Sequence, residues 1–285
     1  MTKLAILADI HGNLPALEAV LDDLKPTRVD RIVVAGDLVN WGPFSAQVVE
    51  RAHDERWAVI RGNNEYYLLD HGTTRAPSSW SDRSQYPLLP WLQSQFTSEL
   101  RAVVATWPDT IGLRFADGPA LRIVHGTPRS PWEPLHSNAS DAELRAALDG
   151  TEESVVVAAH THIAMDRRVD RWRVFNPGSV GVPLDGSFDA RYLILESDGK
   201  DWQPTFRRVS YDRQPLFDEF ERQRFQEQCG VVGELVVDEF RAARLRLHPF
   251  AVWRNTCYPD RPVTPELLDE FRQVDWRRYA PSAYH

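Results

Sequence analysis

Five short apolar runs each end in side chains that can bind a metal ion. The runs are KLAILADIH, DRIVVAGD, WAVIRGNN, ALRIVHG and SVVVAAHTH, and they carry Asp9, His11, Asp37, Asn63, His125, His160 and His162. Runs rich in Val, Ile and Leu are typical of strands that are buried on both faces. Because sites in α/β proteins form outside the carboxyl ends of the strands, we expect all seven side chains to meet at one edge of a sheet.

The number and type of these side chains indicate two metal ions. Imidazoles, carboxylates and an amide are ligands of intermediate to hard character. Seven ligands are too many for one catalytic ion that must keep an open position, but they suit two ions bridged by a carboxylate. With only two carboxylates and a hydroxide, such a site keeps a positive charge that favours a phosphate ester. The spacing of Asp9 and His11, and of His160 and His162, points both members of each pair to one side of an extended backbone.

The segments between these runs favour an α/β architecture with a mostly parallel sheet. A helix is expected over 14–24 with Asn13 as its N-cap, and further helices over 43–53 and 96–105. Ser140 and Glu143 form a capping-box pattern ahead of another helix. From about residue 172 the pattern changes to strands joined by turns, with a hairpin signal at 197–201, which indicates a second, more antiparallel sheet.

Two further segments flank this core. Residues 73–95 are interpreted as a long lid loop near the site, in which Trp80, Tyr86 and Trp91 either stack on a substrate or hold the loop against the body. The second reading is favoured. After Tyr211 the chain is expected to be helical over about 215–228, 231–246 and 265–273. No ligand candidate in this part fits the strand-end pattern, so we interpret it as a helical extension rather than a catalytic domain.

The order of the motifs resembles a known family. DxH at 9–11, GD at 36–37, GNN at 62–64, HG at 125–126 and HTH at 160–162 look like the calcineurin-like metallophosphoesterases, and NPGSVG at 176–181 resembles their small bacterial phosphodiesterase branch. The resemblance implies a four-layer αββα sandwich of two mixed sheets over residues 1–210, followed by an extension over 211–285. It also implies that Asp9, His11 and His162 hold one ion, that Asn63, His125 and His160 hold the other, and that Asp37 bridges them.

This chain departs from the family pattern at one position that bears on catalysis. The family usually reads GNH, and that histidine helps to stabilise or protonate the leaving group, whereas Asn64 stands here with Glu65 after it. An amide cannot supply that proton, although it can hydrogen-bond a phosphate oxygen. We therefore expect Asp37, Asn64 and His125 to take part in catalysis and Asn64 and Arg129 to contact the substrate. His71 is the candidate for a substitute donor. The last motif also begins with Ala159 where the family has glycine, a milder change.

The resemblance implies a binuclear phosphoesterase that uses a metal-bridging hydroxide on small phosphodiesters, nucleotides or activated phosphomonoesters. The expected cofactors are two divalent ions, Mn²⁺ in the first place, with Fe, Zn or Ni as alternatives. Two other functions stay open. One is a protein serine/threonine phosphatase, and the other is a non-catalytic sensor that binds nucleotide or metal through a degenerate site.

Composition narrows the partners. The 285 residues include 42% hydrophobic residues, enough for a core, and carry a formal net charge of −8, which argues against long nucleic acids. No run approaches the roughly 20 apolar residues of a membrane helix, and the first apolar run is too short for a signal peptide. Cys229 and Cys257 match no CxxC pattern. We expect a cytoplasmic protein whose partner is a small phosphorylated molecule; the sequence leaves its oligomeric state open.

Overall fold

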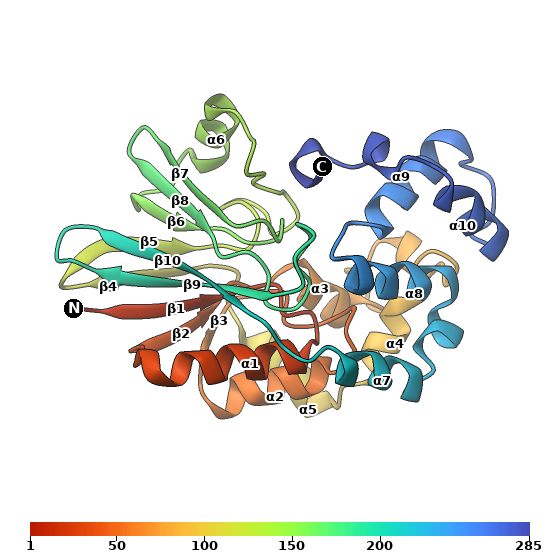
Figure 1. Ribbon diagram of the computed structural model, residues 1–285, viewed down its shortest axis with the longest axis horizontal. Coiled ribbons are helices and arrows are strands. Elements are labelled where there is room, and N and C mark those ends of the chain that lie inside the picture. Colours follow the sequence, from red (N-terminus) through yellow and green to blue (C-terminus); the bar gives the residue numbers. More distant parts are fainter.

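The computed structural model describes all 285 residues and contains two five-stranded sheets (Figure 1). The first sheet has the order β10-β9-β1-β2-β3, and the second has the order β4-β5-β6-β8-β7. The strands are β1 (Lys3–Leu7), β2 (Arg31–Val34), β3 (Ala58–Val59), β4 (Ile111–Phe115), β5 (Gly118–Ile123), β6 (Val155–Val157), β7 (Met165–Val169), β8 (Trp172–Asn176), β9 (Ala190–Ser197) and β10 (Trp202–Val209).

Both sheets are mixed. β1, β2 and β3 run parallel in the first sheet, and β5, β6 and β8 run parallel in the second. The expectation of a separate antiparallel sheet after residue 172 is wrong, because β8 pairs with β6 and β7 whereas β9 pairs with β1. The expected hairpin at 197–201 is confirmed, since it joins β9 to β10 in the first sheet. The buried run of β9 fills an interior position between β1 and β10, which extends the first sheet.

The two sheets pack face to face, and helices cover their outer faces, so that the expected four layers are confirmed (Figure 1). Alternation along β1 shows how the sequence builds this arrangement. Leu4 and Ile6 point into the core between the sheets, whereas Ala5 and Leu7 point towards the helices outside the first sheet. Helix α6 (Asp141–Leu148) packs on the outer face of the second sheet through Leu144 and Leu148.

The predicted helix starts are confirmed where a capping residue signalled them. The Asn13 side chain accepts a hydrogen bond from the backbone N–H of Ala16 at 3.2 Å, and α1 spans Leu14–Leu24 as expected. Ser140 and Glu143 form the expected capping box of α6. The other elements of this part of the chain are η1 (Lys25–Thr27), α2 (Ser45–Asp54), α3 (Asn63–Asp70) and α5 (Ser98–Thr106), of which α2 and α5 begin two residues later than predicted.

Segment 73–95 is not a loop throughout. It contains η2 (Ser78–Ser81) and α4 (Leu88–Ser94), and it is pinned to the body by its aromatic side chains. Trp91 packs edge-on against Phe225 with ring centroids 4.5 Å apart, and Trp80 lies 4.6 Å from the ring of Tyr67. Of the two readings of these aromatic residues, contact with the body is confirmed for Trp80 and Trp91, while the role of the segment as a lid stays a prediction.

The C-terminal helices share the core of the rest of the molecule. They are α7 (Gln214–Arg222), α8 (Phe225–Ala242), α9 (Leu247–Cys257), α10 (Pro265–Arg272), η3 (Trp276–Tyr279) and η4 (Ser282–Tyr284). Helix α9 was not predicted. The helix expected over 231–246 ends earlier, because the chain leaves α8 at Ala243, which has a left-handed φ of 49°. Leu216, Phe225 and Val236 belong to the same buried cluster as Ala5 and Leu7 of β1. None of the helices combines the length and the apolar character that a membrane span requires.

We predict that Phe225→Ala lowers the free energy of unfolding by about 3–5 kcal/mol, the usual effect of removing a buried aromatic ring. The Phe225 side chain is fully buried and contacts Trp91 of α4 and Phe220 of α7, so the cavity would lie where the extension meets the body. Urea unfolding followed by circular dichroism measures the loss. Phe206→Ala, whose side chain is 38% exposed, is the matched control. A separate early transition in the variant, with the main transition unmoved, would contradict a shared core.

Candidate metal centre

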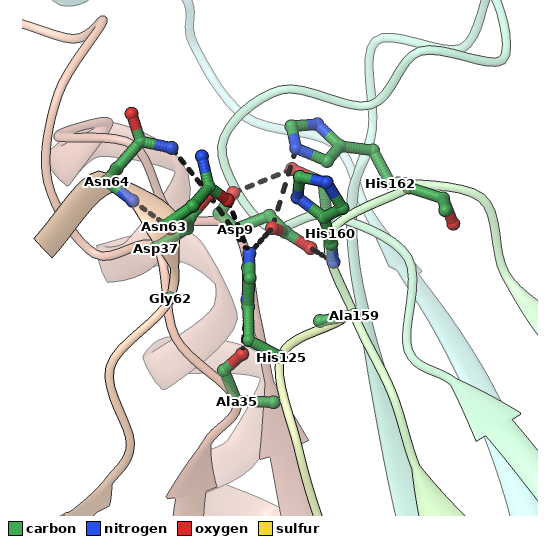
Figure 2. A network of polar contacts seen from close by, with 12 residues as sticks. Asp9, Ala35, Asp37, Gly62, Asn63, Asn64, His125, Ala159, His160 and His162 are labelled. Atoms are coloured by element: carbon green, nitrogen blue, oxygen red, sulfur yellow. Dashed lines mark hydrogen bonds and ion pairs between the residues drawn. The ribbon is translucent and has the colours of Figure 1, made fainter. Parts of the chain in front are cut away.

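The seven predicted ligands converge at one end of the sandwich, where loops of both sheets meet. Figure 2 labels all of them except His11. Asp9 and His11 follow β1, Asp37 follows β2, and Asn63 opens α3. The three remaining ligands come from the second sheet: His125 follows β5, and His160 and His162 follow β6. The expectation that one sheet edge would supply all seven is therefore wrong. Two packed sheets turn their parallel strands towards the same end, so the strand-end rule holds for each sheet separately.

The ligand loops have a left-handed backbone. The φ angles are 52° at Asp9, 47° at His11, 54° at Asp37, 67° at His160 and 60° at His162. Asp and His tolerate this region better than most residues, but each such residue is strained by about 1–3 kcal/mol. The premise of an extended backbone across the i, i+2 pairs is therefore wrong. Asp9 and His11 nevertheless belong to the same ligand group, whereas His160 and His162 belong to different groups.

The first group consists of Asp9, His11 and His162, whose ligand atoms all lie within 4.8 Å of one another. The two Nε2 atoms of His11 and His162 are 3.2 Å apart, and the Nε2 atom of His162 lies 3.5 Å from Oδ1 of Asp9. That Oδ1 atom is buried and accepts no hydrogen bond. Three candidate ligand atoms thus face one another, and the Asp9 oxygen among them has no hydrogen-bond partner.

The second group consists of Asp37, His125 and His160, again within 4.8 Å of one another. Oδ1 of Asn63 adds a fourth donor atom, 3.0 Å from Nε2 of His125. Oδ2 of Asp37 lies 3.2 Å from that same Nε2 atom and 3.6 Å from Nε2 of His11 in the first group. Asp37 is therefore the residue whose carboxylate lies between the two groups.

Hydrogen bonds of the histidines leave their inner nitrogens available. Nδ1 of His125 donates to the carbonyl of Ala35 at 2.8 Å, and Nδ1 of His162 donates to the carbonyl of Val182 at 2.6 Å. In its neutral form, each ring then turns the lone pair of Nε2 into the cluster, as metal-binding histidines do when an outer carbonyl sets their tautomer. The facing lone pairs and the unpartnered Asp9 oxygen fit divalent cations, which would neutralise the repulsion between them.

Burial and the Asp37 carboxylate shift the pKa values of the cluster in different directions. Burial lowers the pKa of His11 to about 4, and burial together with His125 lowers the pKa of His160 to about 3, so both rings are neutral near pH 7. Burial raises the pKa of Asp9 well above its ordinary value. Burial opposes a charged His125, but the carboxylate of Asp37 raises its pKa to about 9. Without a cation the His125 ring therefore holds a proton near pH 7, and a bound cation would displace it, because metal ligands bind in their deprotonated forms.

Glu65 holds the loop that carries Asp37. Its fully buried carboxylate accepts hydrogen bonds from the backbone N–H groups of Gly62, Asp37 and Leu38 at 2.6, 3.0 and 2.8 Å. Gly62 has no room for a side chain, because a Cβ atom would clash with the Asp37 carboxylate. Glu65 therefore ties the loop after β2 to the loop after β3.

Asn64 contacts the bridging residue directly. Its Nδ2 atom donates to Oδ2 of Asp37 at 2.6 Å, and its backbone N–H donates to Oδ1 at 2.9 Å. Its own Oδ1 atom accepts from Nδ2 of Asn40 at 2.7 Å. Both ends of the amide are thus occupied by neighbouring side chains. A contact between Asn64 and the substrate stays a prediction.

The motif at 176–181 packs behind the ligands. The Ser179 hydroxyl donates to the carbonyl of Asp9 at 2.7 Å, and the backbone N–H of Gly181 donates to the same carbonyl at 3.1 Å. Asn176 donates to the carbonyl of Ala159, next to His160, at 2.9 Å. This turn connects the ligand loops of the two sheets.

Two other candidates lie away from the cluster. Arg129 donates to the carbonyl of Ala146 at 2.6 Å and lies 3.6 Å from Glu133, so its guanidinium is engaged on α6. A phosphate contact by Arg129 stays a prediction and requires the side chain to leave these partners. His71 ends α3 as its C-cap residue.

Sequence reasoning missed three residues near the cluster. Trp41 stacks on His11 with ring centroids 4.5 Å apart and planes inclined by 13°. Tyr284, near the end of the chain, is 8% exposed and packs edge-on against His136; burial and then the nearby Asp9 carboxylate raise its pKa. Asn40 holds Asn64. Asn40 and Trp41 form a polar–aromatic pair just after the strand-end Asp37, and this pattern could have signalled both. Nothing local signals Tyr284.

Comparison with known proteins identifies the family. The model of the calcineurin-like phosphoesterase superfamily domain matches residues 2–200. The chain belongs to this superfamily. It is accordingly a metal-dependent phosphoric ester hydrolase, as its order of motifs predicted.

Two relatives and one solved structure match most of the chain. The phosphoesterase is 27% identical to an uncharacterised protein of Methanocaldococcus jannaschii over 80% of this chain and 96% of that one. It is also 27% identical to the phosphodiesterase YfcE of Escherichia coli, over 70% of this chain and 89% of YfcE. A metallophosphoesterase from Sphaerobacter thermophilus has the same fold, with a TM-score of 0.65 at 24% identity, over 85% of this chain and 99% of that one.

We predict that Glu65→Gln weakens metal binding by about 10–100-fold, the usual effect of losing an outer-shell partner. The amide would turn an N–H group towards backbone N–H groups that now donate to a carboxylate oxygen, so the Asp37 loop would shift. Competition titration with a chromogenic chelator measures the affinity. Glu152→Gln, at an exposed position, is the control. A folded Glu65→Gln protein with metal affinity within threefold of wild type would rule out this role.

Proposed function

We propose that the phosphoesterase is a binuclear enzyme that hydrolyses small phosphodiesters, nucleotides or activated phosphomonoesters. The observation that carries the proposal is the position of Asp37, whose Oδ2 atom lies 3.6 Å from His11 of one ligand group and 3.2 Å from His125 of the other. A single carboxylate between two groups of donors is the arrangement that two-metal sites require.

Asp9, His11 and His162 would hold one ion, Asn63, His125 and His160 the other, and Asp37 both. Two divalent ions in such a site supply Lewis acidity towards the phosphoryl oxygens and lower the pKa of water. The donor atoms are nitrogen and oxygen without a thiolate, which supports Mn²⁺ and also allows Fe, Zn or Ni. Glu65 and Asn64 keep the Asp37 carboxylate in place between the two groups.

The relatives support a small ester as the substrate. YfcE is named a phosphodiesterase, and a protein of Paracidovorax citrulli named a symmetrical bis(5′-nucleosyl)-tetraphosphatase is 32% identical over 59% of this chain and 61% of that one. A protein phosphatase and a non-catalytic sensor remain the competing functions. We also propose a cytoplasmic location, which the two free thiols of Cys229 and Cys257 support.

We predict that the wild-type protein hydrolyses bis(p-nitrophenyl) phosphate in the presence of Mn²⁺ and that Asp37→Asn abolishes this activity. The substitution removes one negative charge between two cations, so metal content should also fall below two ions per chain. Release of p-nitrophenolate and elemental analysis give the two readouts. Asp54→Asn, at an exposed position of α2, is the control.

The competing functions predict different results. Turnover of phosphopeptides but of no small diester would favour a protein phosphatase. Tight metal binding without turnover of any ester would favour the sensor. An Asp37→Asn protein with two ions and normal turnover would refute the bridging role.

We predict that kcat/KM falls steeply as the pKa of the leaving group rises across a series of esters. The residue at the position of the usual acid is Asn64, whose amide cannot supply a proton, and general acid catalysis typically contributes about 10²–10⁴-fold. Asn64→His should flatten the dependence if the imidazole reaches the leaving oxygen. The experiment measures kcat/KM for esters of graded leaving-group pKa in wild type, Asn64→His and His71→Ala. A flat wild-type profile that steepens only in His71→Ala would show that His71 is the acid.

A further inference from the structure

A pocket of about 300 Å³ adjoins the metal centre, and nothing in the hydrolytic chemistry uses it. Asn63, a predicted ligand, and Asn64 form part of its wall, as does Trp41, whose ring stacks on His11. The pocket and the metal centre therefore share part of their walls. Its volume is at the lower end of the range for small-molecule sites.

Nearly half of the lining residues come from the C-terminal extension. Val232 of α8, Leu247, Phe250 and Ala251 of α9, and Val263 face residues of α3 and of the segment that leads into α4. The match to the family model ends at residue 200, so this part of the wall lies outside the family domain. The family domain supplies the metal ligands, and the extension closes a cavity beside them.

The lining has a definite chemical character. It contains four aromatic rings, several aliphatic side chains and five amides, with one cation and no carboxylate. The absence of acids is notable in a chain with 41 Asp and Glu residues. The aromatic residues are Trp41, Tyr67, Tyr86 and Phe250, the amides are Asn40, Asn63, Asn64, Gln85 and Asn255, of which Asn63 is a predicted metal ligand, and the cation is Arg254.

Arg254 has no acidic partner. Its guanidinium donates to the carbonyls of Pro259 and Arg261 and, from one terminal nitrogen at 3.0 Å, to Oδ1 of Asn255. No carboxylate lies within ion-pair distance of it, in contrast to most arginines of the chain. A positive group without a counter-ion in a pocket wall favours an occupant that is anionic or rich in hydrogen-bond acceptors.

We propose that this pocket binds the nucleobase of a nucleotide-type phosphoester whose phosphate reaches the metal centre. The inference rests on the proposed function for the phosphate and on the pocket for the base. A planar heteroaromatic ring matches aromatic walls on which it can stack, and its ring nitrogens and carbonyls match amide and guanidinium donors. An acyl chain would make no use of the amide and guanidinium groups of the wall, and a sugar would make no use of its aromatic and aliphatic side chains.

The test compares ligands that differ only in the base. Titration calorimetry on the full chain, with Mn²⁺ and without added metal, measures the Kd of AMP and of ribose 5-phosphate. We expect AMP to bind at least tenfold more tightly than ribose 5-phosphate in both conditions. Ala251→Phe, which fills the pocket from α9, should reduce this preference to less than threefold. Arg254→Gln, which needs no extra volume, should weaken AMP binding at least threefold. Thr256→Phe, at an exposed position of the same helix outside the pocket, is the control and should keep the preference.

The outcomes separate the two proposals. AMP and ribose 5-phosphate binding within threefold of each other in wild type would overturn the base pocket, even if the enzyme hydrolyses aryl diesters. A tenfold preference that survives in both folded variants, Ala251→Phe and Arg254→Gln, would also overturn it. If no ester is hydrolysed, the proposed function fails. The preference for AMP over ribose 5-phosphate without added metal then still tests whether the pocket binds the base.

Discussion

The whole structure depends on holding carboxylates and imidazoles against one another out of water. Asp9 and Asp37 are 0% and 1% exposed, and neither has a guanidinium or ammonium partner. Burial of such groups is unfavourable unless cations or hydrogen bonds compensate. The surroundings provide what a protein can: backbone N–H groups for Glu65, carbonyls for the outer nitrogens of the histidines, and the Ser179 hydroxyl for the Asp9 carbonyl. The remaining repulsion is what divalent ions relieve.

The identity of the ligands could be predicted from the sequence because it depends on local features. A strand-end Asp or His after a run of Val and Ile is visible without knowing how the strands pair. The caps at Asn13 and Ser140 are predictable for the same reason, since their hydrogen bonds reach only three residues along the chain. The missing proton donor at Asn64 is also a fact of the sequence.

The pairing of distant segments could not be predicted in this way. β8 and β9 have similar local patterns, but one joins the second sheet and the other joins the first. Whether His160 and His162 share a group depends on left-handed backbone at both residues, which a two-residue spacing does not reveal. Tyr284 packs against His136 only because the chain returns from α10 to the loop around His136. These outcomes depend on tertiary packing, and local propensity carries no information about them.

The division of the ligands between the two sheets also determines at which stage of folding the site forms. Asp9 and His162 contribute to one ligand group, yet they are separated by more than half of the chain. During synthesis, the first 65 residues present four donors in three loops, and none of these loops has the partners from the second sheet that complete its group. The centre is therefore an element of high contact order, formed after the two sheets dock. A metal ion bound there reports that docking is complete, and its binding energy stabilises the late, native topology rather than any early intermediate.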